Sequence, residues 1–178
     1  MSDPASETVA LVLIGDELLS GHTSDANGPW LGRRLTDEGF RVVSATVAPD
    51  DVDAILLAVE RGLVDARAVL VTGGLGPTSD DVTRLALTRM FAGRVQAEIP
   101  NAVGSEPGMR FDLGKRVVYA VPGVPAEMRS IVDGHVLPEL IATATSLPVC
   151  ATRSLVVVGM PEPQIAQLLS PVEAYLAD

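Results

Sequence analysis

The segment best suited to chemistry is a glycine-rich turn after a β-branched run, Thr72-Gly-Gly-Leu-Gly-Pro-Thr-Ser-Asp-Asp-Val-Thr83. Closely spaced glycines let backbone amides turn toward one point, and a following helix N-terminus adds partial positive charge. The turn lacks both the Gly-Lys-Ser/Thr of a Walker loop and the spacing of a dinucleotide fingerprint. The pattern predicts an anion cradle suited to a phosphate. The residues expected to line it are Gly73, Gly74, Gly76, Pro77 and Thr78.

Two carboxylates, Asp80 and Asp81, close this turn. At the start of a helix they would interact favourably with the helix dipole, which is a purely structural role. Beside a phosphate they would repel the ligand unless a divalent cation lay between them. Mg²⁺ is usually held by oxygen ligands, some of them supplied by the phosphate itself. The pairing therefore favours a site for Mg²⁺ or a similar ion over the structural role.

Three further turns carry polar or glycine residues at strand ends. Asp16 and Glu17 follow the apolar run that ends at Ile14, and Asp16 is a further candidate metal ligand. Pro122 and Gly123 stand in a stiff turn and are candidates to line a ligand. Asp50 precedes an amphipathic segment, where a helix N-cap is its expected structural role. Ligands of parallel α/β sheets bind at the carboxyl ends of the strands, so we expect these turns to meet there.

The elements that would position these turns alternate along the chain, which predicts an α/β fold with a parallel sheet covered by helices on both faces. Residues 92–116 are rich in Gly and Pro and predict a long irregular connection. Strands are predicted at 9–14, 41–47, 68–72, 117–121 and 154–158, and helices from about 23 to 38, then at 50–63, 80–91, 126–142 (interrupted at Pro138) and 163–169.

Composition excludes several classes of protein. The chain has 178 residues, a net charge of −10 and a single lysine, Lys115, which disfavours binding to nucleic acid or anionic membranes. One cysteine, Cys150, and two histidines, His22 and His135, exclude an intramolecular disulfide and a Cys/His zinc site, and we expect structural roles for all three. Apolar runs are short and the first residues are acidic, so we expect a cytoplasmic protein.

Five spaced motifs together resemble the molybdopterin-binding (Mog/MoaB) domain family, and within it the N-terminal domain of the competence/damage-inducible protein CinA. The resemblance covers residues 8 to about 145, and the segment Asn101–Gly108 also resembles that branch. The motifs are Gly15-Asp-Glu-Leu-Leu-Ser-Gly21, Asp25-Ala-Asn27, Pro49-Asp-Asp51, Thr72–Arg84 and Pro122-Gly-Val-Pro-Ala-Glu127.

This resemblance implies a three-layer α/β/α domain that binds a pterin or nucleotide phosphate, with Asn27 among its ligand-binding residues. Asp50 and Asp81 match the two aspartates that serve molybdenum-cofactor chemistry in Mog-type members. The CinA branch implies metal-dependent hydrolysis of a nucleotide pyrophosphate, ADP-ribose, and the family implies a homo-oligomer. It also implies one domain over residues 1–148, followed at 149–178 by a segment that resembles the start of the next CinA domain.

Three functions remain open from the sequence. Asp81, helped by Asp80 or Asp16, would hold a metal for pyrophosphate hydrolysis, with Asp50 as the base or second carboxylate. Alternatively, the domain binds or adenylylates molybdopterin. A third alternative is a binding or assembly module without catalysis. It is favoured by Leu85, where the family commonly has an acid, and by the shortness of residues 91–99, where relatives have several dozen more residues.

Overall fold

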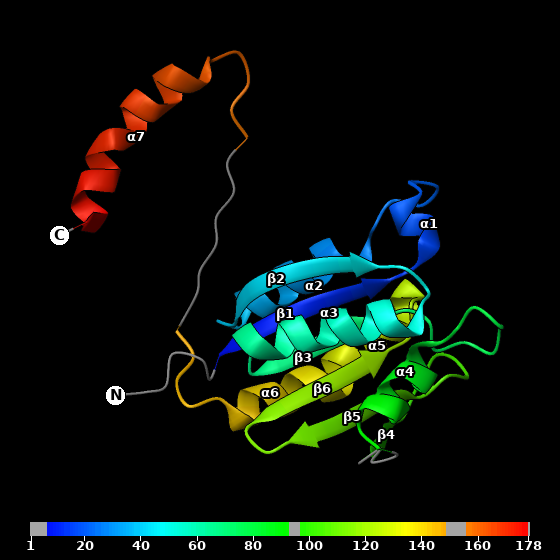
Figure 1. The fold of residues 1–178 in the computed structure, drawn as a ribbon. Helices are drawn as coiled ribbons and strands as arrows, with labels where there is room; N and C mark the ends of the chain where they lie inside the picture. Colours follow the sequence, from blue (N-terminus) through cyan, green and yellow to red (C-terminus); the bar gives the residue numbers. More distant parts are fainter. Residues whose placement is uncertain (1–6, 93–96, 149–155, 178) are drawn as a thin grey trace.

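The computed structural model describes residues 7–92, 97–148 and 156–177, and the strands among them form one mixed sheet in the order β2-β1-β3-β6-β5-β4 (Figure 1). The strands are β1 (Thr8–Ile14), β2 (Arg41–Ala48), β3 (Ala68–Thr72), β4 (Ala97–Ile99), β5 (Gly108–Leu113) and β6 (Arg116–Val121). The neighbours β2, β1, β3 and β6 are parallel, whereas β5 is antiparallel to both β6 and β4. The four strands predicted before residue 122 are therefore confirmed.

Helices cover both faces of this sheet, which confirms the predicted α/β/α layers (Figure 1). Helices α3 and α4 pack on one face, and α2, α5, α6 and a π-helical turn, η1, pack on the other. The helical elements are α1 (Asp16–Leu19), α2 (Asn27–Asp37), α3 (Val52–Asp65), α4 (Thr83–Met90), α5 (Pro125–Ile131), η1 (Val132–Val136), α6 (Leu137–Thr143) and α7 (Glu162–Ala177).

The central strands are apolar throughout because both of their faces are buried. In β1, Val9 and Leu11 belong to the core under α2 and α5, whereas Ala10 and Val12 belong to the core under α3. Alternate side chains of a strand point to opposite faces, so a strand between two helical layers needs an unbroken apolar run. This packing holds the carboxyl ends of β1 and its neighbours in one fixed register.

Two predicted helix starts are wrong, and both corrections change the site. The N-cap of α3 is Asp51, whose Oδ1 accepts a hydrogen bond from the amide of Ala54 at 2.9 Å; it is not Asp50. Helix α4 begins at Thr83 rather than at Asp80, because the residues before it form the turn that returns to Gly74. Asp50 and the acids of the glycine turn are thus left outside the helices.

The predicted irregular connection over 92–116 is also wrong in part, since it contains β4 and β5. Met109 and Phe111 of β5 are buried, while Arg110 between them is only half-buried. A tight turn joins β5 to β6, and Gly114 at its tip has φ of 68°, a conformation that favours glycine. The alternation at Met109–Phe111 is too short to predict this strand by itself.

Beyond β6, the interruption predicted at Pro138 takes the form of the π-helical turn η1 just before it. Proline offers no amide to bond the preceding turn, which accounts for the local widening.

Val156–Val158 form no strand, contrary to prediction, and Ser154 and Cys150 lie outside the described residues. Helix α7 is longer than predicted. Among the described residues no helix combines the length and apolarity needed to cross a membrane.

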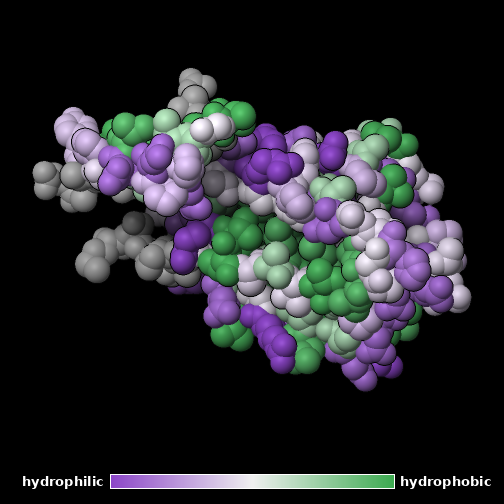
Figure 2. Space-filling view, turned by 90° about the horizontal axis from the view of Figure 1, so that it is seen from above, coloured by the Kyte–Doolittle hydropathy of each residue, from purple (hydrophilic) through white to green (hydrophobic). Residues whose placement is uncertain are grey.

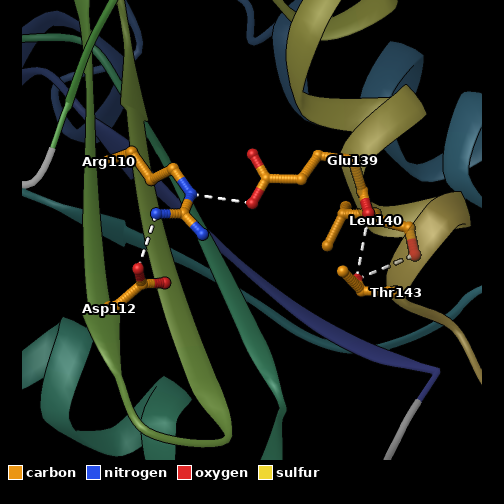
Figure 3. A network of polar contacts seen from close by, with 5 residues as sticks. All are labelled: Arg110, Asp112, Glu139, Leu140 and Thr143. Atoms are coloured by element: carbon orange, nitrogen blue, oxygen red, sulfur yellow. Dashed lines mark hydrogen bonds and ion pairs between the residues drawn. The ribbon is translucent and has the colours of Figure 1, made fainter.

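A polar network fastens the antiparallel strand β5 to helix α6 (Figure 3). The Arg110 guanidinium donates from Nε to Glu139 at 2.7 Å and from Nη1 to Asp112 at 2.6 Å. Burial acts to lower the pKa of Arg110, but its bonds to Glu139 and Asp112 outweigh this and raise it. Burial, followed by the charge of Glu139, raises the pKa of the neighbouring Tyr119 hydroxyl. The network thus ties the antiparallel strand β5 to helix α6.

Candidate functional site

The turns predicted to carry chemistry follow β1, β2, β3 and β6, so they meet at the carboxyl edge of the sheet. This edge brings together Asp16 and Glu17 from the first turn, Asp50 from the second and Asp81 from the glycine-rich turn. Their proximity is reflected in Asp50, on whose ionisation all three other carboxylates act electrostatically. The site therefore begins with four acids around one point.

Asp16 and Asp50 hold each other in place. The amide of Asp16 donates to Oδ2 of Asp50 at 3.0 Å, and the amide of Asp50 donates to Oδ1 of Asp16 at 3.4 Å. Burial raises the pKa of the Asp50 carboxyl; the bond from Asp16 opposes this, and the negative charges of Asp16, Glu17 and Asp81 add to it. Asp50 is thus a fixed carboxylate with an increased affinity for a proton or a cation.

Asp81 has a different environment, because its carboxylate folds back into the glycine-rich turn. Its Oδ2 accepts hydrogen bonds from the Thr78 amide at 2.9 Å and from the Thr78 hydroxyl. Burial would raise the pKa of Asp81, but these bonds and one from the Gly76 amide lower it. Asp81 therefore occupies part of the amide cradle that was predicted to hold phosphate. Asp80, in contrast, accepts a weak bond from the Ser79 hydroxyl at 3.3 Å and no other side-chain bond within the described ranges.

The glycines of the turn do not all act as predicted. The amide of Gly73 donates to the carbonyl of Val121 at 3.1 Å, so it is not free to bind a diphosphate as expected. Gly73 and Gly74 have φ of 105° and 65°, and a Cβ at Gly74 would lie 2.3 Å from Oγ1 of Thr83. Both glycines thus permit the close return of the chain. The amide of Gly74 is therefore the candidate donor, and Pro77 and Thr78 follow it in the same turn.

Asn27 joins the turn after β6 to the end of β3. Its Nδ2 donates to the carbonyl of Gly123 at 2.8 Å and weakly to Oγ1 of Thr72, which itself donates to the carbonyl of Pro122 at 3.0 Å. Because Nδ2 is fixed by the Gly123 carbonyl, Oδ1 has a definite direction, and it is buried with no hydrogen-bond partner among the residues that the structure describes. A buried acceptor without a donor is rare, and a bound ligand can supply the missing donor.

A small cavity lies beside Asn27. Its volume is about 140 Å³, and Glu17, Asp25, Asn27, Thr72 and Gly123 are among its lining residues. Asp25 shapes it by accepting bonds from the amides of Asn27 and Gly28, both at 2.9 Å, at the start of α2. A cavity of this volume has room for one ring or side group of a ligand.

Three residues near this edge escaped the sequence-based site. Nδ2 of Asn101 donates to Oε2 of Glu127 at 2.6 Å, and Oδ1 of Asn101 accepts from the amides of Val103 and Gly104. This pair ties residues 101–108 to the start of α5. Both residues stand inside the motifs, which is the signal that could have found them. Thr83 also stands inside a motif, and its Oγ1 is buried without a hydrogen-bond partner among the described residues.

The residues present fit a metal site that a ligand's phosphate oxygens complete better than one made of protein ligands alone. The described residues contain no group of three or more His, Cys, Asp or Glu arranged to hold a metal ion. Mg²⁺ ordinarily takes one or two carboxylates and completes its shell with phosphate oxygens and water. Asp50 and Asp16 offer two adjacent carboxylates of this kind. Metal binding by Asp16, Asp80 and Asp81 together stays a prediction.

Several known proteins are similar to this chain. A CinA-like protein of Frankia casuarinae is 37% identical over an alignment that covers 90% of this chain and 46% of that protein. Protein PAE0875 of Pyrobaculum aerophilum is 32% identical, with 92% and 74% covered. The chain thus spans about half the length of its CinA-like relatives.

Solved structures are also similar to this chain. The CinA protein of Thermoplasma acidophilum, whose function is described as unknown, superimposes with a TM-score of 0.71 at 26% identity, covering 75% of this chain and 98% of that one. The tungsten-cofactor-synthesising protein MoaB of Pyrococcus furiosus gives 0.62 at 21% identity, covering 79% and 99%, and shows the shared fold alone. A family model described as "Probable molybdopterin binding domain" matches residues 10–142, within the predicted first domain. The chain therefore belongs to the molybdopterin-binding domain family, with CinA-like proteins among its relatives.

Proposed function

We propose that this domain binds a phosphate-bearing nucleotide at the carboxyl edge of its sheet and hydrolyses the nucleotide's pyrophosphate bond. The observation that supports this best is the gathering of Asp16, Asp50 and Asp81 beside the glycine-rich turn. Carboxylates that repel one another next to an anion cradle are suited to a ligand that arrives with a cation. ADP-ribose is the proposed substrate because the CinA resemblance implies it.

Each residue has a proposed role in this chemistry. Asp50, whose raised pKa favours proton uptake, acts as the general base toward water. Asp16 fixes Asp50 through the exchanged amide bonds, and the amide of Gly74 contacts a phosphate oxygen. Asp16 and Asp81 would hold the divalent ion with the phosphates, which leaves Asp50 available as the base. A bound Mg²⁺ would supply charge neutralisation at the phosphoryl group.

The direct test measures release of AMP from ADP-ribose with and without Mg²⁺. The expected result is turnover by the wild-type chain that falls by about 10²-fold or more in Asp50→Asn, the usual scale for a lost general base. Asp37→Asn is the matched control, because Asp37 is an exposed acid at the end of α2. No turnover by the wild type, or equal turnover in Asp50→Asn, would contradict the proposal.

A second candidate function is binding or adenylylation of molybdopterin, and Asn27 supports it. The unpartnered Oδ1 of Asn27 beside a cavity of about 140 Å³ suits a ring N–H donor, and pterins carry several. Calorimetry with molybdopterin and with ADP-ribose separates the two candidates. Tighter binding of molybdopterin, weakened in Asn27→Ala, would favour cofactor work, whereas preference for ADP-ribose would favour hydrolysis.

The third candidate is a binding or assembly module. The alignment with the Frankia relative runs over 199 residues, more than this chain contains, so that relative has residues without a counterpart here. This supports loss of part of the site. Ligand binding with no turnover at any metal concentration is the outcome that would establish it.

A cytoplasmic homo-oligomer is the proposed state of the chain. Strand β2 is at an edge of the sheet, and its Val47 is 38% exposed. The side of the molecule seen from above Figure 1 carries hydrophobic residues surrounded by hydrophilic ones (Figure 2). An apolar edge of this kind can be covered by a second copy. Light scattering of the purified chain tests this, and a monomer at all concentrations would contradict it.

A further inference from the structure

A second cavity among the described residues lies at the opposite end of the sheet from the acidic turns. Its volume is about 640 Å³, against about 140 Å³ for the cavity beside Asn27. It is lined by the loop between α3 and β3, the turn between β5 and β6, and the residues that follow α6. These are the amino ends of β3 and β6, so this cavity is separate from the proposed catalytic edge (Figure 1).

The charge around this cavity is opposite to that of the chain. The net charge is −10 with only 13 Lys and Arg, yet Arg67, Lys115 and Arg116 all line this one cavity. Lys115 is the only lysine of the sequence, and the only acid in the lining is Asp65. Three cations around a hollow in an acidic protein concentrate positive potential where a small anion could enter.

The three cations do not have the same role. Nη1 of Arg67 donates to the carbonyl of Thr143 at 2.8 Å. This carbonyl belongs to the last residue of α6 and has no partner within the helix, so the bond gives Arg67 a structural role. Lys115 and Arg116 have exposed side chains, and within the described part of the chain neither makes an ion pair or side-chain hydrogen bond. Their charges are therefore available to a ligand.

The turn between β5 and β6 sets the backbone positions of Lys115 and Arg116. Leu113 pairs with Arg116, and Gly114 with φ of 68° closes the turn. Val64 and Leu113 add exposed apolar side chains to the cavity wall. A ligand with an anionic group and an apolar body would place its charge near Lys115 and Arg116 and its body against Val64 and Leu113.

We propose that this cavity binds a small organic anion, a phosphate or a carboxylate on an apolar body, through Lys115 and Arg116. The site is independent of the catalytic edge and of the proposed hydrolysis. A ligand of this kind at the amino ends of β3 and β6 would bind whether or not the acidic turns have activity.

The test is a titration of the ¹⁵N-labelled full chain, followed through its amide resonances. The probes are phenyl phosphate and benzoate, which separate the two anion types on one ring, and neutral benzyl alcohol. Saturable shifts are expected at Gly114, Lys115 and Arg116 for at least one anion, with benzyl alcohol binding weakly. The combined variant Lys115→Gln/Arg116→Gln is expected to weaken that binding by about tenfold or more.

A matched control removes two charges elsewhere. Arg33 and Arg89 are exposed, line neither cavity and have no ion pair within the described residues, so Arg33→Gln/Arg89→Gln should retain wild-type affinity. Val64→Glu offers an independent variant, since Val64 is 72% exposed and a carboxylate there should repel the anion without unfolding the chain. Unchanged thermal unfolding midpoints verify that the variants are folded.

Three outcomes would overturn the proposal. These are shifts confined to Gly74–Thr78, equal affinity in Lys115→Gln/Arg116→Gln, and equal affinity for benzyl alcohol.

Discussion

Asp16 and Asp50 exchange hydrogen bonds across the carboxyl edge of the sheet, each carboxylate accepting the other's amide at 3.0 and 3.4 Å. The two residues are 34 positions apart, and the parallel pairing of β1 with β2 brings them together. The bonds orient both carboxylates but do not neutralise them. Their mutual repulsion, and that of Glu17 and Asp81, is a cost that the fold carries at this edge.

Asp50→Asn is therefore expected to stabilise the protein at neutral pH while removing activity. The raised pKa of Asp50 means that the native state favours the protonated carboxyl, so ionisation costs folding free energy. That cost disappears below the ordinary carboxyl pKa of about 4 and increases as the pH rises through the native value. The gain should be about 0.5–2 kcal/mol at neutral pH.

Urea unfolding at a series of pH values checks this, with Asp37→Asn as the control for a lost surface acid. The stability difference between Asp50→Asn and wild type should shrink toward zero as the pH falls toward about 4. A difference that is constant with pH, or a destabilised variant, would contradict the raised pKa.

Asp81→Ala should have the opposite effect. The bonds from Thr78 and Gly76 lower the pKa of Asp81, so its contribution to stability is present above the ordinary carboxyl pKa and lost as the pH falls through the native value. Removing it should cost about 1–2 kcal/mol at neutral pH, as for a lost capping side chain. Asp80→Ala, which removes only a 3.3 Å bond from Ser79, should be nearly neutral. Equal costs for the two variants in urea unfolding would show that the turn does not depend on Asp81.

The sequence was sufficient to predict the parallel core because its strands are buried on both faces and read as continuous apolar runs. It was insufficient for β5, where only Met109 and Phe111 alternate within a stretch of glycine and proline. There the strand is specified by its partner β6 and by the Arg110 network, which are contacts distant in sequence. Local patterning does not contain that information.

The site shows the same limit at shorter range. The acids at the strand ends could be predicted, because a parallel sheet brings its carboxyl ends to one edge. Which aspartate caps α3, and whether Asp81 faces the ligand or its own turn, depends on competition among nearby amides for one carboxylate. Asp51 caps α3 at 2.9 Å, and Asp50, one residue earlier, bonds Asp16 instead. Adjacent identical residues give sequence reasoning no basis for that choice.

A double-mutant cycle on Arg110 and Glu139 should reveal a measurable coupling. Both side chains are about a third exposed or less, and their bond is 2.7 Å long. With Arg110→Met and Glu139→Gln, the coupling free energy in urea unfolding should be about 1 kcal/mol. Arg84 and Glu98, 3.9 Å apart and more exposed, are the matched pair and should give a coupling near zero. Equal couplings would mean that burial does not strengthen the Arg110 network.

Gly74→Ala should be among the most destabilising single substitutions at the site, and Gly21→Ala separates its two causes. Both glycines have positive φ, 65° and 75°, which costs an alanine about 1 kcal/mol. A Cβ at Gly21 meets nothing within 4 Å, whereas at Gly74 it would lie 2.3 Å from Oγ1 of Thr83. Thr83 is fully buried and cannot move away, so the clash should bring the total cost at Gly74 to about 3 kcal/mol. Urea unfolding of both variants measures the difference. Equal costs would mean that the turn relaxes around the added methyl group and that close packing against α4 does not hold the cradle.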